Sequence, residues 1–185
     1  MERTLVILKP DAVKRAILGE IIQRFEKVGL KIIGMKMIVP SKDLLKKHYP
    51  DALVPVIGNK TKKDWSAYNI EHTESAEEIG QIILDATREF MGSGPVIAMV
   101  LEGGHAVEIT RKLVGVTGPK DSPAGTIRGD FAHMSLGDAS TKRRGAANLL
   151  HASGSVDEAN AEIELWFKPE ELYDYQTVHE QFTHA

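Results

Sequence analysis

The sequence predicts an α+β fold of the split β-α-β type, a four-stranded antiparallel sheet with helices on one face. Apolar segments of strand length alternate with amphipathic helical periods, in the order strand, helix, strand, helices, strand, helix, strand. The chain has 185 residues, 42% of them hydrophobic, and no internal repeat, which suits one compact core. We therefore expect a single domain over residues 1–185.

The first strand and helices follow from local patterns near the N-terminus. Residues 5–8 form a continuous apolar run, which predicts a buried strand, and Pro10 after it favours the start of a helix. Apolar residues recur with helical spacing from 17 to 28, and Gly29 is a natural C-terminal stop. These features predict a strand followed by an amphipathic helix.

A second strand, a helix and a looser stretch come next. Residues 33–39 show period-two alternation with one strongly apolar side, which predicts a strand. Ser41 is a suitable cap for the following helix, which carries His48 and Tyr49. From 51 to 74 the pattern loosens and polar residues dominate, so we expect an excursion from the core.

The middle of the chain contains the clearest helix signal. Ser75 and Glu78 match a capping box, which predicts a helix to about Phe90. Residues 96–101 are apolar and predict a strand, and a further helix is expected over 105–114.

A long segment and two short elements complete the prediction. Residues 115–145 lack a regular period, which is unusual in a compact domain and more often functional. A last strand is expected over 147–150. Ser155 and Glu158 match a second capping box for a helix to Trp166, and a polar tail follows.

Composition narrows the functional classes. A formal net charge of −3 gives no general attraction to nucleic acid or anionic membranes. The chain has no cysteine, which excludes disulfides and thiol chemistry, and no glycine-rich loop ending in Gly-Lys-Ser/Thr. It has no apolar run long enough to span a bilayer and no signal-peptide pattern, so we expect a cytoplasmic enzyme without membrane contact.

Residues 148–155, which read NLLHASGS, are the candidate reactive segment. They put His151 after a short apolar strand and among small residues, where a phosphate could approach the ring unhindered. Neutral imidazole can attack a γ-phosphorus to form a reactive phosphoramidate. A histidine taken alone is more often packed or solvated than catalytic, so a nucleophile here depends on the further motifs of the chain.

Three motifs together resemble the nucleoside diphosphate kinase family. Residues 7–13 (ILKPDAV), 125–131 (GTIRGDF) and 148–155 occur in the family's order. The resemblance implies a ferredoxin-like sandwich with two insertions, near 54–88 and 132–146. It also implies Mg²⁺-dependent transfer of the γ-phosphate of ATP to a nucleoside diphosphate, by a ping-pong mechanism through phosphohistidine on His151.

Matching positions give the site residues that the resemblance implies. The catalytic positions are His151, Glu162, Lys9, Tyr49 and Ser153. The nucleotide-binding positions are Lys9, Arg111, Thr117, Arg128 and Asn148. Glu162 would fix the nitrogen of the imidazole that does not attack, while Arg128, in a loop, would bring its guanidinium onto phosphate oxygens. Two positions depart from the family pattern, since Ala152 replaces a usual glycine and Gly154 a usual aspartate.

The metal and the base-binding residue are less defined. Mg²⁺ would be held mainly by phosphates and water, so no protein metal ligand is expected, although Asp51 could touch a metal-bound water. The aromatic residue on which family members stack the base falls inside the first insertion. Several candidates stay open for this contact: Trp65, Tyr68 and an aliphatic clamp of Val54, Val56 and Ile57.

Partners follow from the same resemblance. A homo-oligomer is expected, either a hexamer or a tetramer built from dimers, with ATP and other nucleoside di- and triphosphates as substrates. The alternative is a binding or regulatory module, for which residues 142–144 (KRR) could contact nucleic acid, although such clusters are usually solvated. We therefore expect no nucleic-acid binding, and the intact set of predicted site residues favours the enzyme.

Overall fold

The computed structural model describes residues 1–67, 69–178 and 180–183. Its centre is one antiparallel sheet with the strand order β2-β3-β1-β4. The strands are β1 (Glu2–Leu8), β2 (Lys31–Ile38), β3 (Val96–Gly103) and β4 (Leu150–Ala152). The predicted fold class, a four-stranded antiparallel sheet with helices, is confirmed.

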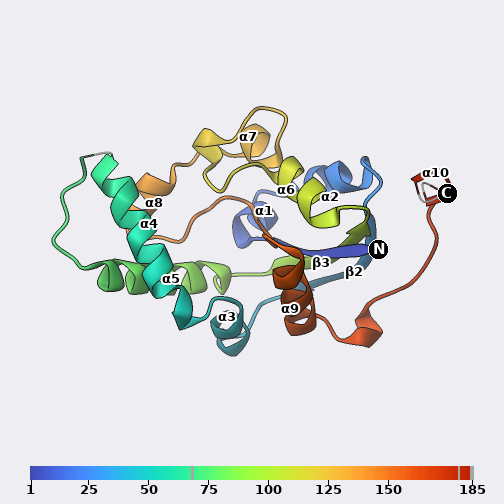
Figure 1. The fold of residues 1–185 in the computed structure, drawn as a ribbon, viewed down its shortest axis with the longest axis horizontal. Coiled ribbons are helices and arrows are strands. Elements are labelled where there is room, and N and C mark those ends of the chain that lie inside the picture. Colours follow the sequence, from blue (N-terminus) through green and yellow to red (C-terminus); the bar gives the residue numbers. More distant parts are fainter. Residues whose placement is uncertain (68, 179, 184–185) are drawn as a thin grey trace.

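Helices cover both faces of this sheet (Figure 1). Val6 and Leu8 of β1 lie in one core cluster, with α1 (Pro10–Lys14), α2 (Leu18–Glu26) and α6 (Ala106–Val114) on that side. Leu5 and Ile7 lie in the other, with α3 (Lys42–His48) and α9 (Val156–Trp166). The expectation of helices on one face is wrong, because a continuous apolar run such as 5–8 marks a strand that is buried on both sides.

The predicted helix caps are formed at two sites and half formed at a third. Ser41 Oγ accepts a hydrogen bond from Leu44 N at 3.1 Å, and the Ser75–Glu78 capping box opens α5 (Ala76–Met91). At α9, Ser155 accepts from Glu158 N, but the Glu158 carboxylate accepts from Gly154 N instead of Ser155 N. The second capping box is therefore incomplete.

The stretch expected to be an irregular excursion contains a helix. After the short turn η1 (Asp51–Leu53), α4 (Val54–Ala67) runs against α5. A Cβ atom on Gly58 would lie 1.7 Å from Ala76 O, and one on Gly80 would lie 2.1 Å from Val54 O. Glycine, which suggested a loop in the sequence, here lets two helices approach closely.

The long segment 115–145 is also partly helical, against expectation. It contains η2 (Pro119–Asp121), α7 (Ile127–Phe131) and α8 (Leu136–Thr141). Helix α8 packs on α4, where Trp65 Nε1 donates to Ser140 Oγ at 2.8 Å. We call α4, α5 and α8 the distal lobe; it lies at the left of Figure 1.

The last strand begins later than predicted. Leu149 has φ 73°, a left-handed backbone that a strand cannot contain, so β4 covers Leu150–Ala152 rather than 147–150. The backbone is held there by Asp11 Oδ2, which accepts from Leu149 N at 3.0 Å. His151 consequently lies inside the strand, opposite Ile7, and not after it.

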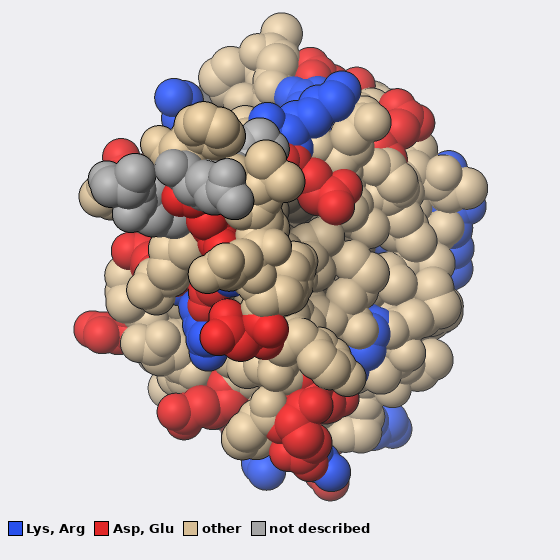
Figure 2. All heavy atoms as spheres, turned by 90° about the vertical axis from the view of Figure 1, so that its right-hand side faces the viewer, with Lys and Arg blue, Asp and Glu red and all other residues tan. Residues whose placement is uncertain are grey.

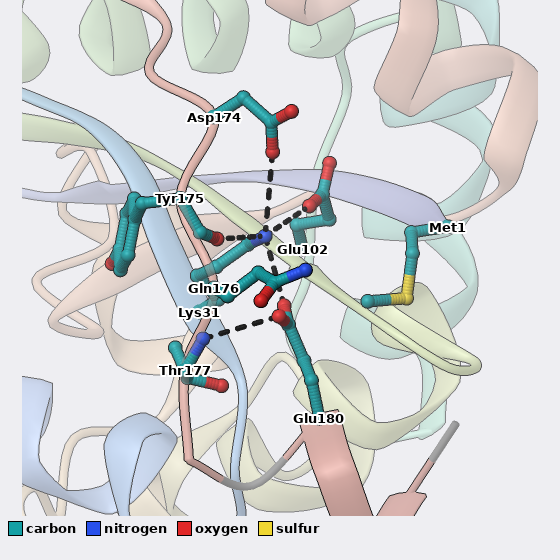
Figure 3. A pocket seen from close by; sticks show the side chains of 8 residues that line it. All are labelled: Met1, Lys31, Glu102, Asp174, Tyr175, Gln176, Thr177 and Glu180. Carbon is teal, nitrogen blue, oxygen red and sulfur yellow. Dashed lines mark hydrogen bonds and ion pairs between the residues drawn. The ribbon is translucent and has the colours of Figure 1, made fainter. Parts of the chain in front are cut away.

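The C-terminal tail passes along β2. After η3 (Pro169–Glu171), Tyr173 N donates to Ile33 O at 2.7 Å, and α10 (Glu180–Thr183) follows. The buried ammonium of Lys31 lies 2.9 Å from both Glu102 and Glu180, as Figure 3 shows. These ion pairs anchor the tail to the sheet, beside a pocket of about 420 Å³.

The surface at the tail end carries mixed charge. Acidic side chains gather beside the tail, with basic ones interspersed rather than forming a continuous basic surface (Figure 2). Within the described part of the chain, no helix has both the length and the apolar character needed to cross a membrane.

Candidate active site

One cleft, of about 280 Å³, gathers most of the predicted site residues from distant parts of the chain. Those that line it are Lys9, Tyr49, Arg111, Thr117, Arg128, Asn148 and His151. The other two, Ser153 and Glu162, are not in its wall and lie next to His151. The structure thus brings the predicted residues together.

His151 is positioned by β4 and a carboxylate. Its side chain is 17% exposed, and Glu162 Oε1 lies 2.8 Å from its Nε2. The two atoms do not meet the geometry of a hydrogen bond, but the short separation makes this a close polar contact. Because Nε2 faces the carboxylate, Nδ1 is the nitrogen available for attack.

Glu162 is held in turn by Ser153. Its Oε2 accepts from Ser153 Oγ at 2.6 Å, and Leu5 N donates to the same hydroxyl at 3.3 Å. Burial opposes ionisation, but the contact with His151 and, to a smaller extent, the hydrogen bond from Ser153 keep the pKa of Glu162 below its ordinary value. Ser153 therefore orients the carboxylate from behind the cleft.

Lys9 lies directly after β1 and is almost fully buried. Its Nζ donates to Asn148 Oδ1 at 2.7 Å. Burial, and then the charge of Arg128, lower the pKa of Lys9 to about 8. The cleft therefore holds a buried ammonium group whose charged form an anionic ligand would stabilise.

Arg128 is 5% exposed and lies in α7, not in a free loop as expected. Its guanidinium donates to four backbone carbonyls, those of Asn148 (3.1 Å), Leu150 (2.6 Å), Gly115 (3.2 Å) and Val116 (3.1 Å). Burial, and then the charge of Arg111, lower its pKa to about 10. Arg128 thus joins the 115–116 segment to β4 as well as supplying charge.

The remaining polar groups complete the wall. Arg111 comes from α6, and its guanidinium lies 3.5 Å from Ala152 O. Asn148 Nδ2 donates to Thr117 O at 2.8 Å, which ties the 117 segment to the approach to β4. Burial raises the pKa of Tyr49 above its ordinary value, so the phenol stays protonated and can donate a hydrogen bond.

Carboxylates are scarce in the cleft. Of the described residues that line it, Glu158 alone carries one, and it accepts from Gly154 N at 2.7 Å. From the sequence, Glu158 was expected only to take part in a helix cap, so its place in the cleft was missed. Asp51 does not line the cleft; its Oδ1 accepts from Arg88 at 2.7 Å.

A nitrogen-rich group of possible metal ligands lies behind the cleft. Atoms of His48, His151 and Glu162 all lie within 4.8 Å of one another. Mg²⁺ prefers oxygen ligands, and His48 Nδ1 already accepts a hydrogen bond from Trp166 Nε1 at 3.2 Å. This group therefore does not fit a magnesium site.

The base-binding candidates are narrowed. Trp65, one of the open candidates, is buried in the distal lobe and donates a hydrogen bond to Ser140, so its ring is not presented to the cleft. Tyr68 lies outside the described residues. The aliphatic clamp stays open, with Val56 exposed and Val54 and Ile57 partly buried.

In the basic cluster, Arg143 pairs with Glu74, and residues 142–144 do not line the cleft.

Comparisons with known proteins agree with this geometry. Residues 2–54 and 61–172 match the family model described as nucleoside diphosphate kinase. The chain is 44% identical to the nucleoside diphosphate kinase of Pyrobaculum aerophilum, over 94% of this chain and 99% of that one, and 44% identical to that of Pyrococcus furiosus, over 95% and 88%.

Solved structures show the same likeness. The crystal structure of an NDP kinase from Pyrobaculum aerophilum has a TM-score of 0.89 at 43% identity, over 94% of this chain and 99% of that chain. A Borrelia burgdorferi nucleoside-diphosphate kinase, solved as a transition-state mimic with vanadate and ADP, has a TM-score of 0.82 at 34% identity, over 99% and 96%.

Proposed function

Because the chain belongs to the nucleoside diphosphate kinase family, we propose that this kinase works by a ping-pong mechanism through a phosphohistidine on His151. The observation that carries the proposal is the arrangement around this ring. Nε2 faces a buried carboxylate, and the ring lies in the wall of a cleft that also holds a lysine and two arginines. Such a site can accept a phosphoryl group and neutralise its charge.

In the first half-reaction, the lone pair on His151 Nδ1 attacks the γ-phosphorus of ATP. The Nδ1–P bond forms, the bond from phosphorus to the β,γ-bridging oxygen breaks, and ADP leaves with that electron pair. Glu162 holds the proton on Nε2 and stabilises the positive ring that develops. In the second half-reaction, a terminal oxygen of another nucleoside diphosphate attacks the same phosphorus and releases the imidazole.

The other residues bind and orient. Lys9 and the phenol of Tyr49 would contact the transferred group, and Asn148 the ribose 3′ region. Arg111, Thr117 and Arg128 would hold the remaining phosphates. Phosphoryl transfer depends mostly on positioning and charge neutralisation, which is what these groups offer.

Magnesium would enter with the nucleotide. When bound, it would supply positive charge that offsets the negative charge developing on the phosphates. The donor set fits this role, since Glu158 is the one carboxylate that the described cleft offers and could bind a metal-held water. The prediction of no direct protein ligand stays a prediction.

Labelling tests the mechanism. Incubation with γ-³²P-ATP should give a label on His151 that is labile in acid and stable in base, and addition of GDP should remove it as GTP. A matched reaction with the His151→Gln variant should give no label. Turnover of ATP and GDP without a labelled enzyme would exclude the ping-pong route and favour direct transfer between the two nucleotides.

We further propose a homo-oligomer, a hexamer or a tetramer of dimers, built on β2. This strand is at the sheet edge and exposes Met35 and Met37, and Val39, directly after the strand, is exposed as well. An exposed apolar edge is a surface that favours pairing with another chain. Sedimentation should give a multimer mass, and Met37→Glu should lower it.

Three further expectations stay proposals. We propose one domain over 1–185 with insertions near 54–88 and 132–146, a cytoplasmic location, and no role in binding nucleic acid. Limited proteolysis would test the first, since a single domain should give no stable fragment split within the insertions. Cell fractionation and a binding assay with DNA and RNA would test the others.

A further inference from the structure

His48 is a second buried histidine beside the nucleophile, and the proposed mechanism does not use it. It ends α3, and its side chain is fully shielded from solvent. Its ring meets those of His151, Trp166 and Tyr49 edge-on, with centroids 4.6, 5.4 and 4.4 Å away. The contacts of this buried titratable ring determine which of its nitrogens carries the proton.

Two groups approach the same nitrogen of His48. Trp166 Nε1 donates to Nδ1 in an aligned hydrogen bond of 3.2 Å. Glu162 Oε1 lies 3.3 Å from Nδ1 without an aligned hydrogen bond. Since the indole N–H can only donate, Nδ1 must carry the lone pair, and the proton of the neutral ring is on Nε2.

The ring is neutral for reasons of burial and charge. Burial, and then the charge of His151, lower the pKa of His48 to about 3, against the opposing effect of Glu162. Lys9 acts in the same direction as His151. His48 therefore adds no cation beside the nucleophile at neutral pH.

The tautomer of His48 determines which hydrogen-bond donors Glu162 can use. Its Oε2 is satisfied by Ser153, while Oε1 lies between Nε2 of His151 and Nδ1 of His48. Because Trp166 occupies Nδ1, His48 presents no proton to the carboxylate. The donor available to Oε1 from these two rings is therefore His151 Nε2.

We propose that His48, fixed by Trp166, is a positioning residue that keeps Glu162 directed at His151. The His151 proton then stays on Nε2, and the lone pair on Nδ1 faces the phosphate. This inference rests on the proposed function, because it concerns the readiness of the same nucleophile. Orienting groups that act through another residue typically change activity by about 10–100-fold in metal sites, which gives the scale of effect.

Trp166→Phe is the variant that exposes the mechanism. Without the indole N–H, His48 can move its proton to Nδ1 and donate it to Glu162, which then divides its contact between two rings. We expect kcat to fall by roughly tenfold, with KM close to the wild-type value, because the nucleotide contacts in the cleft are unchanged.

His48→Phe supplies the matched test. Phenylalanine keeps an aromatic wall behind Glu162 but has no nitrogen that could compete for it. The double variant Trp166→Phe/His48→Phe should therefore turn over faster than Trp166→Phe alone. A purely structural role for both residues predicts the opposite, since the two packing defects would add.

Nitrogen-15 NMR of the ring tautomers completes the experiment and needs no turnover. In the wild type, His48 and His151 should both carry the proton on Nε2, and in Trp166→Phe the His48 proton should move to Nδ1. An unchanged His48 tautomer in Trp166→Phe, or a double variant slower than the single, overturns the inference. A wild-type enzyme that forms no phosphohistidine would instead overturn the proposed function. The ring tautomers of His48 and His151 would still show whether His48 and Trp166 position Glu162.

Discussion

The cleft and the distal lobe are built in different ways. In the cleft, Lys9 and Arg128 are buried polar groups, as is Glu162 behind it, and each is held by contacts to strands or to the segments beside them. In the distal lobe, helices meet through glycine backbones and one indole–hydroxyl bond. Buried charge requires fixed partners, whereas helix packing requires only matching shapes. Changes in the two regions should therefore act on different quantities.

The largest effect is expected at the nucleophile. His151→Ala should lower phosphate exchange by more than about 10³-fold, because no other group can carry the phosphoryl intermediate. Nucleotide affinity, measured by calorimetry, should stay close to wild type. His133→Ala is the control, since His133 is exposed and does not line the cleft. Exchange that persists in His151→Ala would contradict the assignment.

Arg128→Ala should affect stability and binding together. It removes a buried cation that donates to four carbonyls, at a cost of about 2–4 kcal/mol in the free energy of unfolding. The free energy of unfolding, measured in urea, and the nucleotide affinity should both fall. Arg128→Lys, which keeps the charge but loses the planar fork, should recover binding more than stability. A variant that loses binding but keeps full stability would show that the carbonyl contacts contribute little.

Gly58→Ala should act on the distal lobe alone. The added Cβ would meet Ala76 O at 1.7 Å, so α4 and α5 must separate, at a cost of about 1–3 kcal/mol. Gly19→Ala in α2 is the matched control, because its Cβ would have open space. The melting temperature should drop for Gly58→Ala and stay unchanged for Gly19→Ala. The kcat of both variants should change little. A large loss of kcat would show that the lobe and the cleft are coupled.

The smallest effect concerns the pH dependence of binding. The pKa of Lys9 is lowered to about 8, so its charge is lost from the free enzyme as pH rises through that value. Triphosphate affinity should then weaken by up to about tenfold between pH 8 and 9. By the same linkage, Lys9 contributes stability above about pH 10.5 that is lost as pH falls through about 8.

The Lys9→Arg variant tests whether the loss of charge on Lys9 causes this pH dependence of triphosphate affinity. Arginine stays charged over this range, so its affinity curve should be flat even where its absolute affinity is lower. A wild-type curve that is equally flat would assign the charge in the cleft to other groups.

Part of the candidate site was predictable from three short motifs, which contain Lys9, Arg128, Asn148, His151 and Ser153. Tyr49, Arg111, Thr117 and Glu162 lie outside these motifs and followed only from matching positions in the family. The roles of the buried ones were less predictable. Arg128 looked free in a loop, whereas its partners come from 115–116 and from 148–150, which only the folded chain brings together. The position of His48 likewise depends on a tertiary contact, the hydrogen bond from Trp166, which periodicity does not report.

The fold was predicted best where local chemistry decides. The cap at Ser41 and the box at Ser75 are local, and both helices begin where expected. The prediction was wrong for α4, where Gly58 serves helix packing, and for β4, where tertiary hydrogen bonds hold Leu149 in a left-handed conformation. In these two places the surrounding structure overrides the propensity of the residues.

The central claim is that phosphorus bonds to Nδ1 of His151 while Glu162 holds Nε2. Phosphorus–nitrogen correlation NMR of the ¹⁵N-labelled phosphoenzyme measures this directly, since it identifies the ring nitrogen bonded to phosphorus. We predict a single phosphohistidine, substituted on Nδ1. Phosphorus on Nε2, or on a residue other than His151, would contradict the account.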